Sequence, residues 1–192
     1  MRPGTATERW DDWMQLYRHG VFVVLPPPAV ARVVDAQRAR FDPQSAEICG
    51  AYVTLSEPLA SPLSDAQADE VADAMARVAP FTLRYGPLHT VEPHPGVVYA
   101  ITPAEPFEAL RDALAATSAF RGSRPVRGDV PAHMTVAEFV SVERSAEILE
   151  ELAHRYMTGS FLCDTVTLIV PDSGFCFRAV RGFSLGGTGS RS

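Results

Sequence analysis

The stretch that decides the fold is AHMTVA at residues 132–137, and AYVTL at residues 51–55 resembles it. Polar and apolar residues alternate in both stretches with a period of two, which predicts β-strands with one face in the core. On the later stretch, His133 and Thr135 share one face while the apolar residues between them turn to the other. We therefore predict two related strands, each with a ring side chain and a threonine on the same face.

The segments around the two strands repeat the same order of elements. Apolar periodicity and turn residues predict helix 7–18, strand 21–25, helix 29–40, strand 51–55, helix 64–79, strands 81–88 and 96–101, helix 107–120, strand 132–140, helix 145–157 and strands 161–170 and 175–185. Ser64 and Ser145 are the expected caps of their helices. The repeated order indicates a degenerate duplication. We expect an α+β, bilobal duplicated fold, with two antiparallel sheets backed by helices and a central cleft.

Composition excludes several classes of protein. The chain has 192 residues, 46% of them hydrophobic, which suits one domain or two small halves that share a core. A net charge of −6 argues against a general nucleic-acid binder but leaves room for a local phosphate site. Cys49, Cys163 and Cys176 are too few and too widely spaced for a disulfide framework or a cysteine-based zinc site. Without a signal peptide or a spanning segment, we expect a soluble, cytoplasmic protein.

The polar face of the two strands suits a phosphate. An imidazole exchanges a proton near neutral pH, and a hydroxyl donates to a phosphoryl oxygen, so His133 and Thr135 can both act on one phosphate. Tyr52 and Thr54 repeat the arrangement on the earlier strand. If a pseudo-two-fold axis relates the strands, all four side chains face one cleft. The alternative is two half-exposed strands with ordinary polar outer faces, because H-x-T is a short and common pattern.

These triplets and the bilobal strand–helix order resemble the two-histidine (2H) phosphoesterase superfamily, which includes RNA 2′,3′-cyclic phosphodiesterases and 2′-5′ RNA ligase-like proteins. The resemblance extends from about residue 20 to residue 186. It implies two H-x-T motifs that line a cleft, no metal or other cofactor, and hydrolysis or reverse ligation of a 2′,3′-cyclic phosphate. By this resemblance, His133 is a catalytic histidine, Thr135 and Thr54 are phosphate ligands, and Tyr52 stands where the family has its first histidine.

The tyrosine makes the expected mechanism asymmetric. Opening a cyclic phosphate needs a base to activate water and an acid for the leaving oxygen. A tyrosine with a pKa near ~10 stays protonated at neutral pH, so it is a poor base and a usable hydrogen-bond donor. We expect His133 to be the base and Tyr52 to donate to the phosphate or the leaving oxygen. Two alternatives remain: a weakened module that binds nucleotide or RNA ends without turnover, and an unrelated α+β domain with an accidental H-x-T.

The expected domain organisation has three parts. Residues 1–19 are an amphipathic helical extension, residues 20–186 a single bilobal phosphoesterase-like domain, and residues 187–192 a flexible tail. The extension carries Trp10, Trp13, Met14 and Tyr17 at helical spacing. We interpret this stripe as packing against the main body.

Two further groups of residues are candidates for the site. His89 or His94 could reach the cleft and replace the missing histidine. Arg121, Arg124 and Arg127 precede the second motif and could hold a phosphate, although a solvated arginine loop is the simpler interpretation. The expected partner is a small nucleotide or an RNA end carrying a phosphate, with no DNA duplex, no membrane and a monomeric chain.

Overall fold

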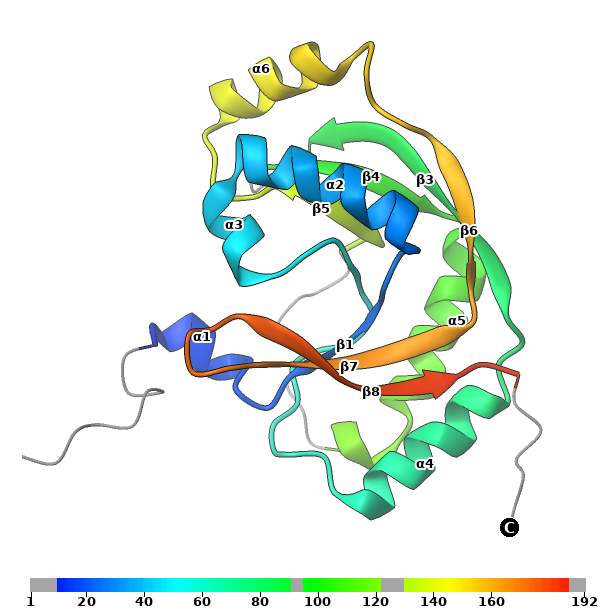
Figure 1. The fold of residues 1–192 in the computed structure, drawn as a ribbon. Coiled ribbons are helices and arrows are strands. Elements are labelled where there is room, and N and C mark those ends of the chain that lie inside the picture. Colours follow the sequence, from blue (N-terminus) through cyan, green and yellow to red (C-terminus); the bar gives the residue numbers. More distant parts are fainter. Residues whose placement is uncertain (1–9, 91–94, 122–129, 187–192) are drawn as a thin grey trace, which may run out of the picture.

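The computed structural model of the chain describes residues 10–90, 95–121 and 130–186. In this part of the chain, one curled sheet of eight strands forms the centre, and every neighbouring pair of strands is antiparallel (Figure 1). The order across the sheet is β6-β3-β4-β5-β2-β1-β7-β8. The strands are β1 Val21–Val24, β2 Val53–Thr54, β3 Phe81–Thr90, β4 Val97–Thr102, β5 His133–Ala137, β6 Gly159–Cys163, β7 Thr165–Pro171 and β8 Phe177–Ser184.

Six α-helices and one short 3₁₀-helix are described beside the sheet. They are α1 Asp12–Leu16, α2 Pro28–Phe41, α3 Pro43–Ile48, α4 Asp65–Ala76, α5 Ala104–Ala115, η2 Ser118–Phe120 and α6 Val142–Leu152. Helix α2 packs on β5, α4 packs on β8 and α5, and α6 packs on β3 and β4. None of the helices in the described ranges is long and apolar enough to cross a membrane.

The α+β class is confirmed, but the two sheets that we expected are joined into one. Strands β6-β3-β4-β5 form one half and β2-β1-β7-β8 the other, and the halves meet where Val53 pairs with Met134. Without this pairing, β2 and β5 would each leave an open edge with unpaired backbone groups. The pairing of β2 with β5 therefore provides hydrogen-bond partners for the backbone groups of both edges.

The halves exchange strands, so neither half is a continuous stretch of chain. Strand β3 follows β2 in the sequence but lies in the other half, beside β4. The predicted strand 161–170 is wrong as one element, because it splits at Asp164 into β6 and β7. Strand β6 pairs with β3 and β7 pairs with β1, so the chain crosses from one half to the other at this break.

The alternation predicted for both motif strands is confirmed. The apolar members Val53, Leu55, Met134 and Val136 are at most 1% exposed and lie in the main core. The polar members Tyr52, Thr54, His133 and Thr135 are half-buried on the opposite face. Side chains alternate along an extended chain, so local pattern alone is enough to place them.

Of the two predicted helix caps, one is confirmed and one is wrong. The cap at Ser64 is confirmed, because its hydroxyl accepts from the Gln67 backbone and the Ser64 backbone amide donates to the Gln67 side chain. Ser145 is wrong as a cap: α6 begins one turn earlier, where Ser141 accepts from the Arg144 backbone amide. Ser145 is instead buried in the first turn and donates to the Ser141 carbonyl oxygen.

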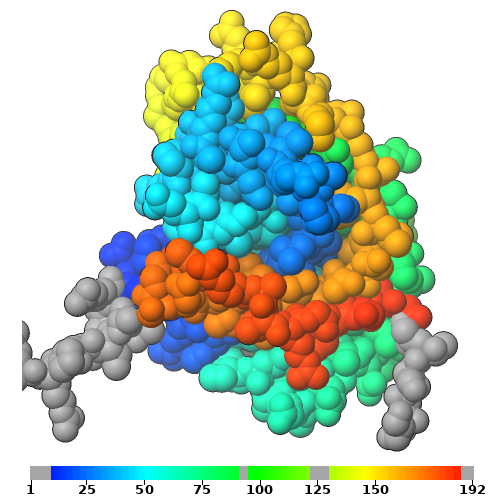
Figure 2. All heavy atoms as spheres, in the orientation of Figure 1, coloured from blue at the N-terminus to red at the C-terminus, as the bar shows by residue number. Residues whose placement is uncertain are grey.

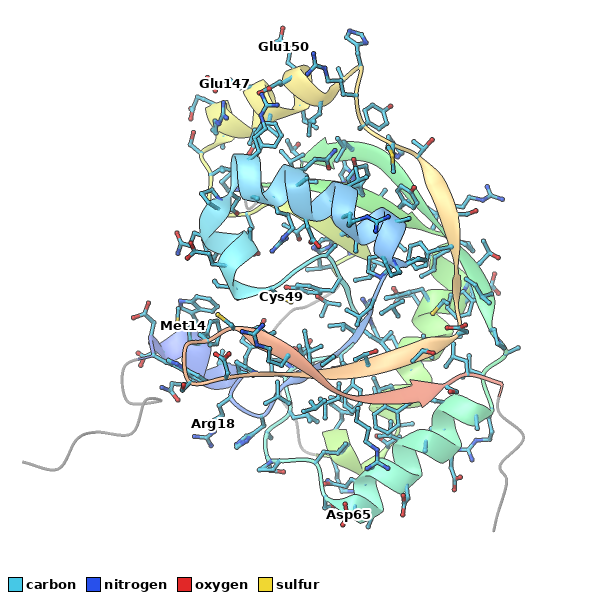
Figure 3. All side chains as sticks on the ribbon, viewed as in Figure 1. Met14, Arg18, Cys49, Asp65, Glu147 and Glu150 are labelled. Atoms are coloured by element: carbon cyan, nitrogen blue, oxygen red, sulfur yellow. The ribbon has the colours of Figure 1, made fainter. Side chains whose placement is uncertain are left out.

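The extension at the N-terminus is helical over a shorter range than predicted. Helix α1 covers Asp12–Leu16, and residues 1–9 lie outside the described part. Figure 3 shows Met14 of α1 beside the turn of the β7–β8 hairpin. The tail expected at residues 187–192 also lies outside the described residues. The predicted helix 107–120 ends at Ala115, followed by η2, and α3 was not predicted.

Candidate functional site

The pairing of β2 with β5 brings the two motif triplets side by side. Val53 lies opposite Met134 in an antiparallel register. This register puts Tyr52 next to Thr135 and Thr54 next to His133, because each step along one strand is matched by a step back along the other. Cross-strand neighbours on one face are within reach of a common small ligand.

All four polar side chains line a single cavity of about 310 Å³. This volume lies at the lower end of the range for small-molecule sites. The cavity is formed between α3 and the motif strands on one side and α1 with the β7–β8 hairpin on the other. Figure 2 shows α3 directly above the hairpin, with α1 at the hairpin's end. The structure thus brings together the four residues that the sequence selected.

The ring of His133 is oriented by the backbone. Its Nδ1 lies 2.8 Å from the carbonyl oxygen of Pro131. A carbonyl oxygen only accepts hydrogen bonds, so Nδ1 carries the proton and Nε2 carries the lone pair of the neutral ring. This assignment makes Nε2 the nitrogen that can take a proton from a reacting group.

A bulge in β5 adds residues to the cavity that the sequence did not suggest. Val97 pairs with Ala137 but Val98 pairs with Thr135, so Val136 is an extra residue on β5. The bulge breaks the simple alternation, and Glu138 and Phe139 consequently line the same cavity as Thr135.

The chain after the bulge is held by the N-cap residue of α3. The Asp42 carboxylate accepts from the backbone amides of Glu138 at 2.8 Å and Phe139 at 3.1 Å. Its other oxygen accepts from the Ser45 amide at 3.1 Å. One buried carboxylate therefore caps α3 and anchors the end of β5 at the cavity.

A buried arginine lies behind the second motif. Arg38 is 2% exposed and donates to the Thr135 carbonyl oxygen at 2.9 Å and to the Ser45 hydroxyl at 2.7 Å. The Ser45 hydroxyl in turn donates to the Glu138 carboxylate at 2.6 Å. This network ties β5 to α2 and α3. Sequence analysis missed Arg38, although it continues the buried stripe of α2 that the sequence shows as Val30, Val34, Arg38 and Phe41.

The N-terminal aromatic stripe packs on the body, and part of it also lines the cavity. Trp13 contacts Phe175 with ring centroids 5.2 Å apart, and Tyr17 contacts Phe177 at 6.2 Å. All four of these rings are among the lining residues. The sequence predicted the packing role but not the place of the stripe at the site.

Of the two histidines proposed to compensate for Tyr52, only His89 lies in the described part of the chain, and it does not join the site. His89 is exposed on β3, where it pairs with Val98, and does not line the cavity. His94, Arg124 and Arg127 lie outside the described residues. Arg121 is exposed after η2 and does not line the cavity. Within the described ranges, no group of three or more His, Cys, Asp or Glu side chains could hold a metal.

Two of the cysteines have thiols with raised pKa values, of which Cys163 is buried and Cys49 is half-buried. Burial raises the pKa of Cys49 to about 11 and that of Cys163 to about 12. Both thiols are therefore protonated at neutral pH and are poor nucleophiles. Figure 3 places Cys49 between α3 and the β7–β8 hairpin, on the segment that leads to Tyr52.

Comparisons with known proteins agree with this fold. The fold is similar to that of apo LigT from E. coli, with 16% identity, a TM-score of 0.56, and coverage of 87% of this chain and 96% of that chain. TT0787 from Thermus thermophilus has 14% identity and a TM-score of 0.55, over 88% of this chain and 98% of that chain. No curated protein matches the sequence. Residues 26–174 match the sequence profile of the 2′-5′ RNA ligase superfamily. The chain therefore belongs to the 2′-5′ RNA ligase superfamily of 2H phosphoesterases.

Proposed function

We propose that this chain is a metal-independent phosphoesterase that acts on the 2′,3′-cyclic phosphate of a nucleotide or an RNA end, by hydrolysis and, in reverse, by 2′-5′ ligation. The observation that carries the proposal is the convergence of Tyr52, Thr54, His133 and Thr135 on one cavity. The superfamily membership supports the reaction class. Structures of E. coli LigT with phosphate and with 3′-AMP support a phosphate-bearing nucleotide as the ligand.

The proposed mechanism uses His133 as the base. Its Nε2 takes a proton from water as the water oxygen attacks phosphorus, and a new P–O bond forms. The P–O bond to one ribose oxygen breaks, and that oxygen takes a proton from the Tyr52 hydroxyl or from solvent and leaves as a hydroxyl. The proton held by His133 then returns to Tyr52 or to solvent, which restores the starting state of the site. The products are a ribose phosphomonoester and a free neighbouring hydroxyl, with one water consumed. In ligation, a ribose hydroxyl of a second strand attacks phosphorus in place of water. The product is then a phosphodiester, and no water is consumed.

Tyr52 and the two threonines stabilise the phosphate in this mechanism. The threonine hydroxyls donate to phosphoryl oxygens, and the Tyr52 hydroxyl donates to a phosphoryl oxygen or to the leaving oxygen. A phenol hydroxyl is a weaker acid than an imidazolium and transfers its proton less readily, so we expect slow turnover. Glu138 also lines the cavity, and the hydrogen bond from Ser45, backed by Arg38, partly offsets its charge.

A second candidate function is binding without turnover. The observation that favours it is Tyr52, because a single histidine leaves the acid–base pair incomplete. In that case the threonines and His133 would hold a nucleotide or RNA end that the protein does not cleave.

The test compares wild type, His133→Ala and Tyr52→His on 2′,3′-cyclic nucleotides and on an RNA oligomer with a 2′,3′-cyclic phosphate end. Hydrolysis that falls in His133→Ala and rises in Tyr52→His supports the proposed mechanism. Binding of 3′-AMP in wild type without any turnover supports the second candidate. The absence of both turnover and binding would exclude both functions.

A further inference from the structure

The cavity has two chemically different regions. The polar floor consists of Tyr52, Thr54, His133 and Thr135. The aromatic wall consists of Trp13, Tyr17, Phe139, Phe175 and Phe177. Every floor residue lies within residues 26–174, the range that matches the superfamily, whereas four of the five wall residues lie outside it. The wall is therefore built mainly by the part of this chain that the superfamily profile does not include.

The wall is held in place by ring contacts. Helix α1 has only five residues, too few to be stable by itself in water. Trp13 contacts Phe175 edge to face at 5.2 Å, and Phe175 contacts Phe177 at 5.4 Å. Trp10 adds a contact to Phe175 at 5.1 Å and donates from its indole nitrogen to the Ser173 carbonyl oxygen at 3.2 Å. The hairpin turn thus fixes the N-terminal segment against the cavity.

Two backbone features direct these rings. Phe175 has a φ of 63°, a left-handed conformation that is unusual for a residue with a side chain. Gly20 has a φ of 93°, and a Cβ there would lie 2.3 Å from the Ile169 carbonyl oxygen. Only glycine fits this turn, which directs the chain from α1 into β1 beside β7.

Aromatic surface remains open at the cavity although the wall is packed from behind. Trp13 is 41% exposed and Phe139 is 48% exposed, and their ring centroids are 6.3 Å apart. Large exposed rings of this kind, next to donors that suit a phosphate, provide a surface for a flat apolar group of the same ligand.

The charges of the cavity narrow the class of ligand. Glu138 is the one carboxylate among the described lining residues, and no lysine or arginine is among them. A ligand with several phosphates would find no side-chain cation among those residues. A nucleoside with a single phosphate fits better, because its phosphate meets the floor and its uncharged base meets the wall.

We propose that Trp13 and Tyr17, with Phe175 and Phe177, form a specificity element that binds the nucleobase of a ligand whose single phosphate occupies the polar floor. This inference rests on the proposed function for the position of the phosphate. Stacking of a base on an aromatic side chain strengthens binding enough that loss of one stack changes Kd by about 10-fold or more.

The first experiment uses fluorescence, which does not depend on turnover. The chain has two tryptophans, Trp10 and Trp13, so the variant Trp10→Phe reports on Trp13 alone. Titration with 3′-AMP is expected to quench this fluorescence, and ribose 3-phosphate, which lacks the base, is expected to leave it unchanged. Absence of quenching by 3′-AMP would overturn the inference. Quenching without any hydrolysis of cyclic nucleotides would retain the inference and reject the proposed catalysis.

The second experiment measures Kd by calorimetry for Trp13→Ala and for the matched control Leu16→Ala. Leu16 lies on the same helix and is 47% exposed, but it does not line the cavity. We expect Trp13→Ala to weaken 3′-AMP binding about 10-fold, with inorganic phosphate binding unchanged, and Leu16→Ala to change neither. Retention of affinity in Trp13→Phe would support stacking as the cause. Equal losses for 3′-AMP and inorganic phosphate, or no loss at all in Trp13→Ala, would contradict a nucleobase site.

Discussion

The two motif strands differ in length and in the hydrogen bonds that hold them. Strand β5 has five residues, a histidine ring oriented by the Pro131 carbonyl oxygen, and a buried arginine bonded to its backbone. Strand β2 has two residues, and a tyrosine takes the corresponding ring position just before it. Both present a threonine to the same cavity. In the proposed function, the comparison teaches that both strands supply a threonine for the phosphate, while the proton transfer that needs a ring nitrogen falls to β5 alone.

The most direct way to test this asymmetry is to remove the polar group at each ring position in turn: the imidazole of His133 and the hydroxyl of Tyr52. His133→Ala is expected to lower kcat/KM on a 2′,3′-cyclic nucleotide by about 10²–10⁴, the range for loss of a general base. Tyr52→Phe keeps the ring and loses only the hydroxyl, so we expect a fall of about 10-fold from one lost hydrogen bond. Steady-state kinetics at neutral pH measure both. Equal losses in the two variants would show that the strands contribute symmetrically.

The anchor of β5 gives the next largest effect. Arg38→Met removes the buried guanidinium and leaves the Thr135 carbonyl oxygen and Ser45 without their donor. We expect the free energy of unfolding to fall by about 3 kcal/mol, as for other broken buried polar networks. Denaturant unfolding measures it.

The matched control for that measurement is Arg40→Met on the same helix. Arg40 is exposed and pairs with Glu151 at the surface, so its loss is expected to cost less than about 1 kcal/mol. Similar losses in the two variants would mean that Arg38 does not anchor β5.

The two threonines test whether the strands are equivalent as phosphate ligands. Thr135→Val and Thr54→Val each replace a hydroxyl by a methyl group of similar size. We expect each variant to weaken binding of inorganic phosphate by a similar factor of about 10, because one hydrogen bond to a charged group is lost. Calorimetric titration measures the affinity. A loss confined to Thr135→Val would extend the asymmetry from catalysis to binding.

The smallest expected effect is the pH dependence of stability that comes from Cys49, on the segment that leads into β2. Burial raises the pKa of Cys49 from its ordinary value of 9.0 to about 11. In the unfolded chain the thiol ionises first as pH rises, so its contribution to stability is fully present below about pH 9 and is lost between about pH 9 and 11. We expect the free energy of unfolding of wild type to fall by about 1 kcal/mol from about pH 9 to about pH 10 because of this thiol.

Cys49→Ser provides the comparison for this pH dependence. It removes the titrating group, so its stability is expected to decline less steeply over the same interval. Thermal unfolding at several pH values measures the difference. Cys163 also has a raised pKa and stays in both proteins, so its contribution cancels in the comparison. Identical slopes would show that Cys49 does not titrate with unfolding.

The local features of the site could be read from the sequence. The alternation predicted which side chains face the core and which face the cavity, and burial agrees over residues 51–55 and 132–136. The cap at Ser64 was predicted for the same reason, because its partner lies only three residues away in the chain. Side-chain direction along a strand and capping at a helix start depend on neighbours in the chain, and these are visible in the sequence.

The tertiary structure alone decided the rest. The break at Asp164 depends on β6 and β7 pairing in opposite halves of the sheet, and the bulge at Val136 depends on the register with β4. Arg38 reached Thr135 across 97 positions of sequence, and Trp13 reached the hairpin through Phe175. Such contacts join segments far apart in the chain, where local periodicity carries no information about partners. The sequence by itself determined which side chains form the polar floor, and only the folded chain placed the anchor behind it and the aromatic wall beside it.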